Sequence, residues 1–233
     1  MITTTDAPAW LRRSDQAVGW ARTMLQRDHA VVIDCETTDL PGGVCEVAVV
    51  DTCGRILLNS LVNPKQPISP AANKVHNITD QMVAGAPTFP DVFAEILRVT
   101  ASRRVLAYNA AFDRACLLAD SQRHDRDPQH LDDPDTWGCI MRARSAWVGT
   151  PDHFYPLGAA PRAVGDAMAA LTVCRQLQST PDSIHDGVTV SPRRRNADLG
   201  QPSSHIPSMP HHFVRRVRSG CLGGVRRPFP QRT

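Results

Sequence analysis

An apolar segment at residues 30–33, Ala-Val-Val-Ile, leads directly into two acidic residues one position apart, Asp34 and Glu36. Val and Ile are typical of buried β-strands, and side chains two positions apart on a strand project from the same face. The two carboxylates are therefore predicted to lie side by side at the end of a buried strand, where like charges repel each other. We expect a positively charged group between them.

Strand-like and helix-like segments follow one another along the rest of the chain. Two more apolar runs, 44–51 and 55–63, are joined by a short turn and predict a hairpin. Residues 104–109 predict a further strand, with a helix directly behind it. Further helices are predicted at 14–27, 88–102, 137–149 and 162–177, and a loop at 124–136. A three-strand meander followed by strand–helix units indicates an α/β fold, a mixed sheet flanked by helices.

Charge is distributed unevenly along the 233 residues, which together carry a net charge of +3. From residue 181 onward there are nine Arg and three Asp, a net charge of +6, whereas the preceding part holds 17 basic and 20 acidic residues, a net charge of −3. The end of the chain is rich in Pro, Ser, Arg and His without periodicity. We predict one domain at 14–178 and a disordered basic tail at 179–233. Such a tail could contact phosphates or be a solvated segment without a role.

The chain also carries indications of its compartment. The amino-terminal residues lack the apolar core of a secretory signal, and no apolar run approaches the length that spans a membrane. The seven cysteines are an odd number, and none forms a C-x-x-C pair. These features favour a reduced, cytoplasmic protein without a membrane partner.

Two further acidic residues lie on apolar helix faces. Asp113 shares its predicted face with Leu117, and Asp166 shares one with Ala170. Either acid alone would be read as a helix cap or a solvated edge. Four acids at the edges of apolar faces, without an accompanying set of Cys and His, predict an oxygen-ligand site for Mg²⁺ or Mn²⁺ and argue against zinc.

Three segments in order, "VVIDCETTDL", "VLAYNAAFD" and "RAVGDA", resemble the three exonuclease motifs of the DnaQ-like 3′–5′ exonucleases of the DEDD superfamily. The segment "LVNPKQPISPAANKVHNITDQMVAGAPTFPDV" resembles the one that follows the third strand in the same family. A D-x-E pair alone would be a weak signal, but the ordered set spans residues 15–178. The resemblance implies an RNase H-like fold, with a three-strand antiparallel meander plus parallel strands.

The resemblance also implies roles for individual residues. The four carboxylates would bind two divalent ions, Mg²⁺ or Mn²⁺, which clamp the scissile phosphate and activate a water. His76 begins His-Asn-Ile-Thr where the family has His-Gly-Ile-Thr, and Asn tolerates the backbone that Gly adopts. Phe112 could equally belong to the core. The residues implied to contact the terminal nucleotide are Thr37, Thr38, Leu40, His76, Asn109 and Phe112.

The chain departs from this family at the general base. In the His-containing (DEDDh) branch a His lies five residues before the last Asp, and that position is Pro161. The Tyr-containing branch would have its Tyr at position 162, which is Arg162. Two alternatives remain open: His153 in the preceding loop substitutes as the base, or the chain is catalytically impaired.

The sequence thus predicts a metal-dependent 3′–5′ exonuclease that releases nucleoside monophosphates from single-stranded nucleic acid, with DNA favoured over RNA. Loss of the base would weaken this activity, or leave a catalytically inactive module that binds nucleic-acid ends. A separate alternative is an RNA-trimming enzyme of the same fold, similar to RNase T or oligoribonuclease. The expected partners are single-stranded DNA or RNA 3′ ends, and the resemblance also allows a DNA polymerase or repair protein.

Overall fold

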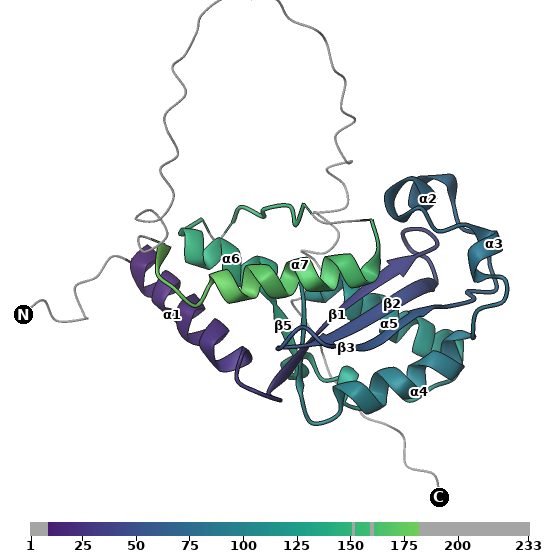
Figure 1. Ribbon diagram of the computed structural model, residues 1–233, viewed down its shortest axis with the longest axis horizontal. Coiled ribbons are helices and arrows are strands. Elements are labelled where there is room, and N and C mark those ends of the chain that lie inside the picture. Colours follow the sequence, from purple (N-terminus) through teal and green to yellow (C-terminus); the bar gives the residue numbers. More distant parts are fainter. Residues whose placement is uncertain (1–8, 151, 159–160, 182–233) are drawn as a thin grey trace, which may run out of the picture. The chain divides into compact units, whose positions relative to one another are not determined.

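A five-stranded mixed sheet forms the centre of the computed structural model, which describes residues 9–150, 152–158 and 161–181 (Figure 1). The strand order is β3-β2-β1-β4-β5. The first three strands form the antiparallel meander, and the last two run parallel to β1. The strands are β1 (Ala30–Thr37), β2 (Val44–Asp51), β3 (Ile56–Leu61), β4 (Arg104–Ala107) and β5 (Trp137–Cys139). The predicted α/β architecture is confirmed.

Helices cover both faces of this sheet. Val31 and Ile33 of β1 pack with the helices α4 and α5, whereas Val32 between them packs on the opposite face with α1, α6 and α7. The alternation follows from the strand geometry, and it makes β1 a buried strand with an apolar layer on each side. The helices are α1 (Ala9–Met24), α2 (Pro70–His76), α3 (Asp80–Val83), α4 (Phe89–Thr100), α5 (Ala110–Arg123), α6 (Ile140–Val148) and α7 (Ala163–Gln176), with short 3₁₀ turns η2 (Gln129–Leu131) and η3 (Pro134–Thr136).

The turn between β1 and β2 is fixed by hydrogen bonds from several elements. The backbone N–H of Thr38 donates to the carbonyl of Gly43 at 2.9 Å, and the Thr38 hydroxyl accepts from the Gly43 N–H at 3.0 Å and from the Gln66 amide at 2.6 Å. On the far side, Asp120 of α5 accepts from the Val44 N–H at 2.7 Å. The turn after β1 is therefore held by its own hydrogen bonds, and the start of β2 is held by α5.

The predicted loop at 124–136 is confirmed and contains two short 3₁₀ turns. Two other details of the predicted secondary structure were wrong. Residues 137–149 do not form one helix, because Trp137–Cys139 pair with β4 as an edge strand before α6 begins. The first helix begins at Ala9 and not at residue 14, and Ser14 is buried inside it, donating to the carbonyl of Trp147. In each case a tertiary contact decides what the local sequence leaves open.

The tail predicted at 179–233 lies, from residue 182 onward, outside the described residues. None of the helices in the described ranges is both long and apolar enough to cross a membrane. The six cysteines in those ranges are all free thiols, and three of them, Cys35, Cys45 and Cys174, are buried.

We predict that Gly42→Ala destabilises the fold by about 1–3 kcal/mol, because the added methyl group would overpack the turn. A Cβ at Gly42 would lie 2.5 Å from the carbonyl oxygen of Asp39 and 2.7 Å from the hydroxyl of Thr38. Gly19 in α1 is the matched control, since a Cβ there meets no other element of the described chain within 4 Å. Gly19→Ala should stabilise by about 0.5–1 kcal/mol. Urea unfolding followed by circular dichroism measures both changes, and equal effects would contradict the prediction.

Candidate active site

Three carboxylates meet at the carboxyl end of β1. Asp34 and Glu36 project from the face of β1 that α7 covers, because they continue the alternation of Val32. Asp166 enters the same space from the start of α7. One carboxylate oxygen from each of the three residues lies within 4.8 Å of the others. The predicted pairing of Asp34 and Glu36 is thus joined by an acid 130 residues further along the chain.

Asp113 approaches the same strand end from the opposite face. It lies in the first turn of α5, is 3% exposed, and accepts a hydrogen bond of 3.1 Å from the backbone N–H of Cys35. Cys35 stands between Asp34 and Glu36 in the sequence, so Asp113 is next to the cluster without being one of its three mutually close members. The structure brings three of the four predicted acids together and holds the fourth beside them.

The surroundings raise the pKa of every one of these acids. Burial is the main cause for Asp34, whose pKa is raised further by the charges of Asp113 and Glu36. Burial followed by the charge of Asp166 raises the pKa of Glu36 to about 7. Burial raises the pKa of Asp113 to about 8, against the hydrogen bond from Cys35, and that of Asp166 to about 6. Close carboxylates in a buried site retain protons near neutral pH unless a cation compensates them.

The donor set fits a hard divalent cation. The Oδ1 atom of Asp166 is buried and lacks a hydrogen-bond partner within the described ranges. An unpaired buried acceptor is costly, and here it lies beside the carboxylates of Asp34 and Glu36. The cluster consists of carboxylate oxygens alone, which are the ligands that Mg²⁺ and Mn²⁺ prefer.

A buried ion pair next to this cluster was missed by the sequence analysis. Glu46 of β2 stands opposite Glu36 in the antiparallel register and is 1% exposed. The Nε of Arg162 donates to the Glu46 oxygens at 3.0 and 2.9 Å, and its Nη2 donates as well. An acid within a strand of otherwise buried apolar residues requires a partner, and this requirement was the signal that could have identified the pair.

His76, predicted to contact substrate, instead connects α2 to the end of β1. Its ring is buried, its Nδ1 accepts from the Ile78 N–H at 3.0 Å, and Nε2 lies 3.1 Å from the carbonyl of Thr37. Because Nδ1 accepts, the proton of the neutral ring is on Nε2 and is donated to Thr37. Burial lowers the pKa of His76 and so favours this neutral form. Asn77 adopts a left-handed backbone with φ of 58°, as expected for a residue in the position of Gly.

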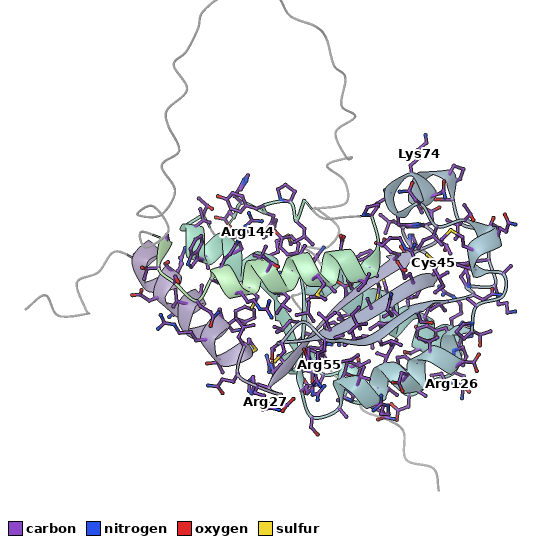
Figure 2. The ribbon with its side chains drawn as sticks, in the orientation of Figure 1. Arg27, Cys45, Arg55, Lys74, Arg126 and Arg144 are labelled. Atoms are coloured by element: carbon purple, nitrogen blue, oxygen red, sulfur yellow. The ribbon has the colours of Figure 1, made fainter. Side chains whose placement is uncertain are left out.

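The surface near this connection is visible in the side-chain view. Figure 2 shows Lys74 projecting from α2 away from the sheet, whereas Cys45 lies on β2 among the packed side chains. The Cys45 sulfur is 4.0 Å from the Nε2 of His76. The outer surface of α2 is thus available to solvent, while its inner surface holds the strand end.

The other predicted substrate residues fall into two groups. The hydroxyl of Thr37 donates to the carbonyl of Asp39, and that of Thr38 accepts within the turn, so both are occupied internally. Leu40 is 53% exposed at the tip of the turn. Asn109 and Phe112 are half-buried at the start of α5, and Phe112 belongs to none of the apolar clusters of the described residues. Among the six predicted substrate residues, Leu40 and Phe112 are therefore the two whose apolar side chains remain accessible to a substrate.

The two positions considered for the base, Pro161 and His153, are both exposed. Pro161 is exposed and precedes the N-cap residue of α7. His153 is exposed too, with its ring edge-on to Tyr155 at 4.5 Å and its carbonyl accepting from Ser145 at 2.5 Å. In the described part of the chain no contact joins His153 to Asp166 or to the other acids. The loop is instead held on α6 by Ser145.

Comparison with known proteins identifies the family. Residues 31–173 match the family model described as Exonuclease (RNase_T). The chain belongs to this exonuclease family. It is 39% identical over 122 residues to exodeoxyribonuclease 10 of Escherichia coli K12, which covers 51% of this chain and 48% of that protein. It is 32% identical over 100 residues to the DNA polymerase III subunit epsilon of Pasteurella multocida, covering 38% of this chain and 40% of the subunit.

The fold is similar to that of solved exonuclease structures. A solved complex of E. coli ExoI with single-stranded DNA superimposes with a TM-score of 0.55 at 15% identity, over 69% of this chain and 42% of that one. At this identity the likeness concerns the fold alone, and it supports the predicted RNase H-like architecture. The chain spans about half the length of the curated relatives it matches. It therefore represents an exonuclease domain, and the activities of the longer relatives do not transfer to it directly.

We predict that the metal-free protein loses stability as pH rises from about 4 to about 8. Glu36 and Asp113 have folded pKa values of about 7 and about 8, above those of unfolded chains, which are near 4. Their contribution to stability is complete below the unfolded pKa and is lost as pH rises through the folded pKa. The midpoint of thermal unfolding, measured with a chelator, should fall across this range.

Excess Mn²⁺ should remove most of that decline, because the bound cation compensates the ionised carboxylates. Asp113→Asn is the matched variant, and it should flatten the chelated profile. A midpoint that is constant with pH in the chelated wild type would contradict the raised pKa values.

Proposed function

We propose that this domain is a metal-dependent 3′–5′ exonuclease that hydrolyses the 3′-terminal phosphodiesters of single-stranded nucleic acid, with DNA as the favoured substrate. The observation that carries the proposal is the meeting of Asp34, Glu36 and Asp166, one of whose oxygens is buried without a partner. Asp113 beside them completes the set of four acids. Membership of the exonuclease family and the name exodeoxyribonuclease of a 39% identical relative support the reaction and the choice of DNA.

The four acids have separate tasks in this proposal. Asp34, Glu36 and Asp166 would hold divalent ions, two by analogy with the family, and Asp113 would support the same ions from the α5 side. When bound, Mg²⁺ or Mn²⁺ supplies Lewis acidity and lowers the pKa of a coordinated water. The chain positions these carboxylates on rigid elements, a central strand and the starts of two helices, so that little reorganisation is needed.

Recognition of the terminal nucleotide would fall to the side chains that remain accessible. Leu40 at the tip of the turn and Phe112 at the start of α5 would offer accessible apolar surface for the terminal base. Thr37, Thr38 and His76 would act indirectly, by holding the turn that carries Leu40. Contacts of this type do not distinguish bases, in keeping with an enzyme that removes any terminal nucleotide.

The proton of the attacking water would pass to bulk solvent. Pro161 cannot accept a proton, and His153 is held against Tyr155 by the contacts described above. General-base help is typically worth about 10²–10⁴-fold, so turnover should be slower than in an enzyme with the base by a factor of that order. The alternative function is a domain that binds nucleic-acid ends without cutting them, and it too would follow from the absence of a base at Pro161. The cleavage assay below distinguishes this alternative from slow cleavage.

The setting of the domain is also a proposal. A cytoplasmic location rests on the free cysteines of the described residues, and a DNA polymerase or repair partner rests on likeness to a DNA polymerase III subunit. We propose that the domain comprises residues 14–178. Its first helix, α1, begins earlier in the chain, at Ala9.

We predict that Asp34→Ala sharply weakens metal binding and abolishes cleavage. Removing Asp34 takes one of the three close carboxylates from the cluster, and metal affinity should fall at least about 10-fold. Calorimetric titration with Mn²⁺ measures binding, and labelled single-stranded DNA and RNA measure cleavage. Asp80→Ala is the matched control, because it also removes one acidic side chain. Asp80 accepts from the Ile68 N–H and does not belong to the cluster of three carboxylates. Equal Mn²⁺ affinity in wild type and Asp34→Ala would overturn the proposed site.

We also predict that Pro161→His raises the cleavage rate by about 10²-fold or more. The new imidazole would stand five residues before Asp166, where it can accept the proton of the attacking water. Pro161→Asn is the matched control, since it relaxes the backbone in the same way but cannot act as a base. The rate of Pro161→His should show a titration near the imidazole pKa that Pro161→Asn lacks.

His153→Ala should leave the rate of the wild type nearly unchanged, because its contacts place it on the α6 side of the loop. A large loss in His153→Ala would identify it as the base and contradict this reading. A wild type that binds Mn²⁺ but cuts nothing at high enzyme concentration would leave the binding module as the function.

A further inference from the structure

The start of α7 is not capped by its own residues. Arg162 is the N-cap residue and makes no side-chain capping bond, whereas the Oε2 of Glu46 accepts from the first helical N–H, that of Ala163, at 3.0 Å. The first amides of a helix need acceptors, and a carboxylate there also interacts favourably with the helix dipole. Glu46 therefore caps α7 from the neighbouring strand β2.

Arg162 fixes the orientation of that capping carboxylate. Its Nε and Nη2 both donate to Glu46, so the planar guanidinium binds the carboxylate at two points. Glu46 is buried and Arg162 is partly exposed. A buried carboxylate without this partner would be unstable, and a two-point contact restricts its rotation more than a single ammonium can.

The pair connects α7, which carries Asp166, to β2, the strand that pairs with the one carrying Glu36. Glu46 stands opposite Glu36 across the β1–β2 register, and α7 places Asp166 three residues after Ala163. Figure 1 shows α7 lying across the strands β1 and β2. The first turn of α7 is thus joined to β2 next to Glu36. The position of this turn determines where Asp166 lies relative to Glu36.

We propose that Glu46 and Arg162 are positioning residues of the metal site, which set the distance between Asp166 and Glu36 by fixing where α7 begins. The inference rests on the proposed metal-dependent function and adds two residues that do not themselves contact the ion. The alternative is a purely electrostatic role, in which Arg162 would change metal affinity only through its positive charge.

The two roles predict opposite signs for metal affinity. Removing the positive charge of Arg162 should strengthen cation binding if charge alone matters, because repulsion is relieved. It should weaken binding if the pair positions Asp166, because the start of α7 becomes loose. Arg162→Lys keeps the charge but loses the two-point contact, so charge alone predicts no change and positioning predicts weaker binding.

The test is calorimetric titration of the full chain with Mn²⁺, with thermal unfolding to show that each variant folds. We expect Arg162→Lys, Arg162→Gln and the double variant Glu46→Gln/Arg162→Gln each to bind Mn²⁺ about 10-fold more weakly or worse. The double variant keeps the net charge and leaves no unpaired buried carboxylate, so it remains informative if Arg162→Gln does not fold.

Arg175→Gln is the matched control. Arg175 lies on the same helix and donates to the carbonyl of Thr52 at 2.9 Å, so it also joins α7 to the sheet, but at the far end from the acids. It should bind Mn²⁺ as wild type does. Unchanged or tighter binding in the Arg162 variants would overturn the positioning role while leaving the metal site in place. A wild type that binds no Mn²⁺ would overturn the proposed function and this inference together.

Discussion

Burial of several carboxylates at one strand end is the constraint on which the rest of the structure depends. Each acid loses hydration, and each raises the free energy of ionising its neighbours. Such a cluster persists only where the scaffold is stable enough to hold it, and β1 supplies that stability with apolar layers on both faces. The acids come from the end of this strand and from the starts of α5 and α7, all of which are anchored in those layers.

The other buried acids of the described residues show how unusual the cluster is. Asp51 is paired with Arg55, Asp120 with Arg123 and the Val44 N–H, and Glu46 with Arg162. The burial of Asp51 raises its pKa, but the bonds from Arg55 and Cys53 outweigh burial and lower it. The buried Oδ1 atoms of Asp120 and Asp166 both lack a hydrogen bond within the described ranges, but that of Asp120 faces Arg123 in an ion pair, whereas no ion pair is found for Asp166 there. An acid that the chain leaves uncompensated, where its neighbours are compensated, indicates that the missing charge comes from outside the chain.

The sequence predicted those features that depend on local patterns. The apolar run before Asp34 defined β1, and helix periodicity placed Asp113 and Asp166 on faces that pack on the sheet. The edge strand at Trp137–Cys139 could not be predicted, because three residues carry no period and pairing with β4 decides their conformation. Glu46 was overlooked for a related reason. Its partner Arg162 lies 116 positions away, and only the fold shows that the two meet.

The absence of a general base and the Glu46–Arg162 ion pair would both affect how readily the attacking water loses its proton. A metal ion acidifies its bound water through uncompensated positive charge, and every carboxylate around it reduces that charge. In the proposed site the four acids would match the charge of two divalent ions, and a free fifth carboxylate would reduce the acidity of the water further. Arg162 neutralises Glu46, which would otherwise be that fifth acid beside Glu36. Because this chain carries Pro161 in place of a base, the proposed mechanism would rely on a bound metal ion to acidify the water. The ion pair of Glu46 with Arg162 would then keep Glu46 from lowering that acidity.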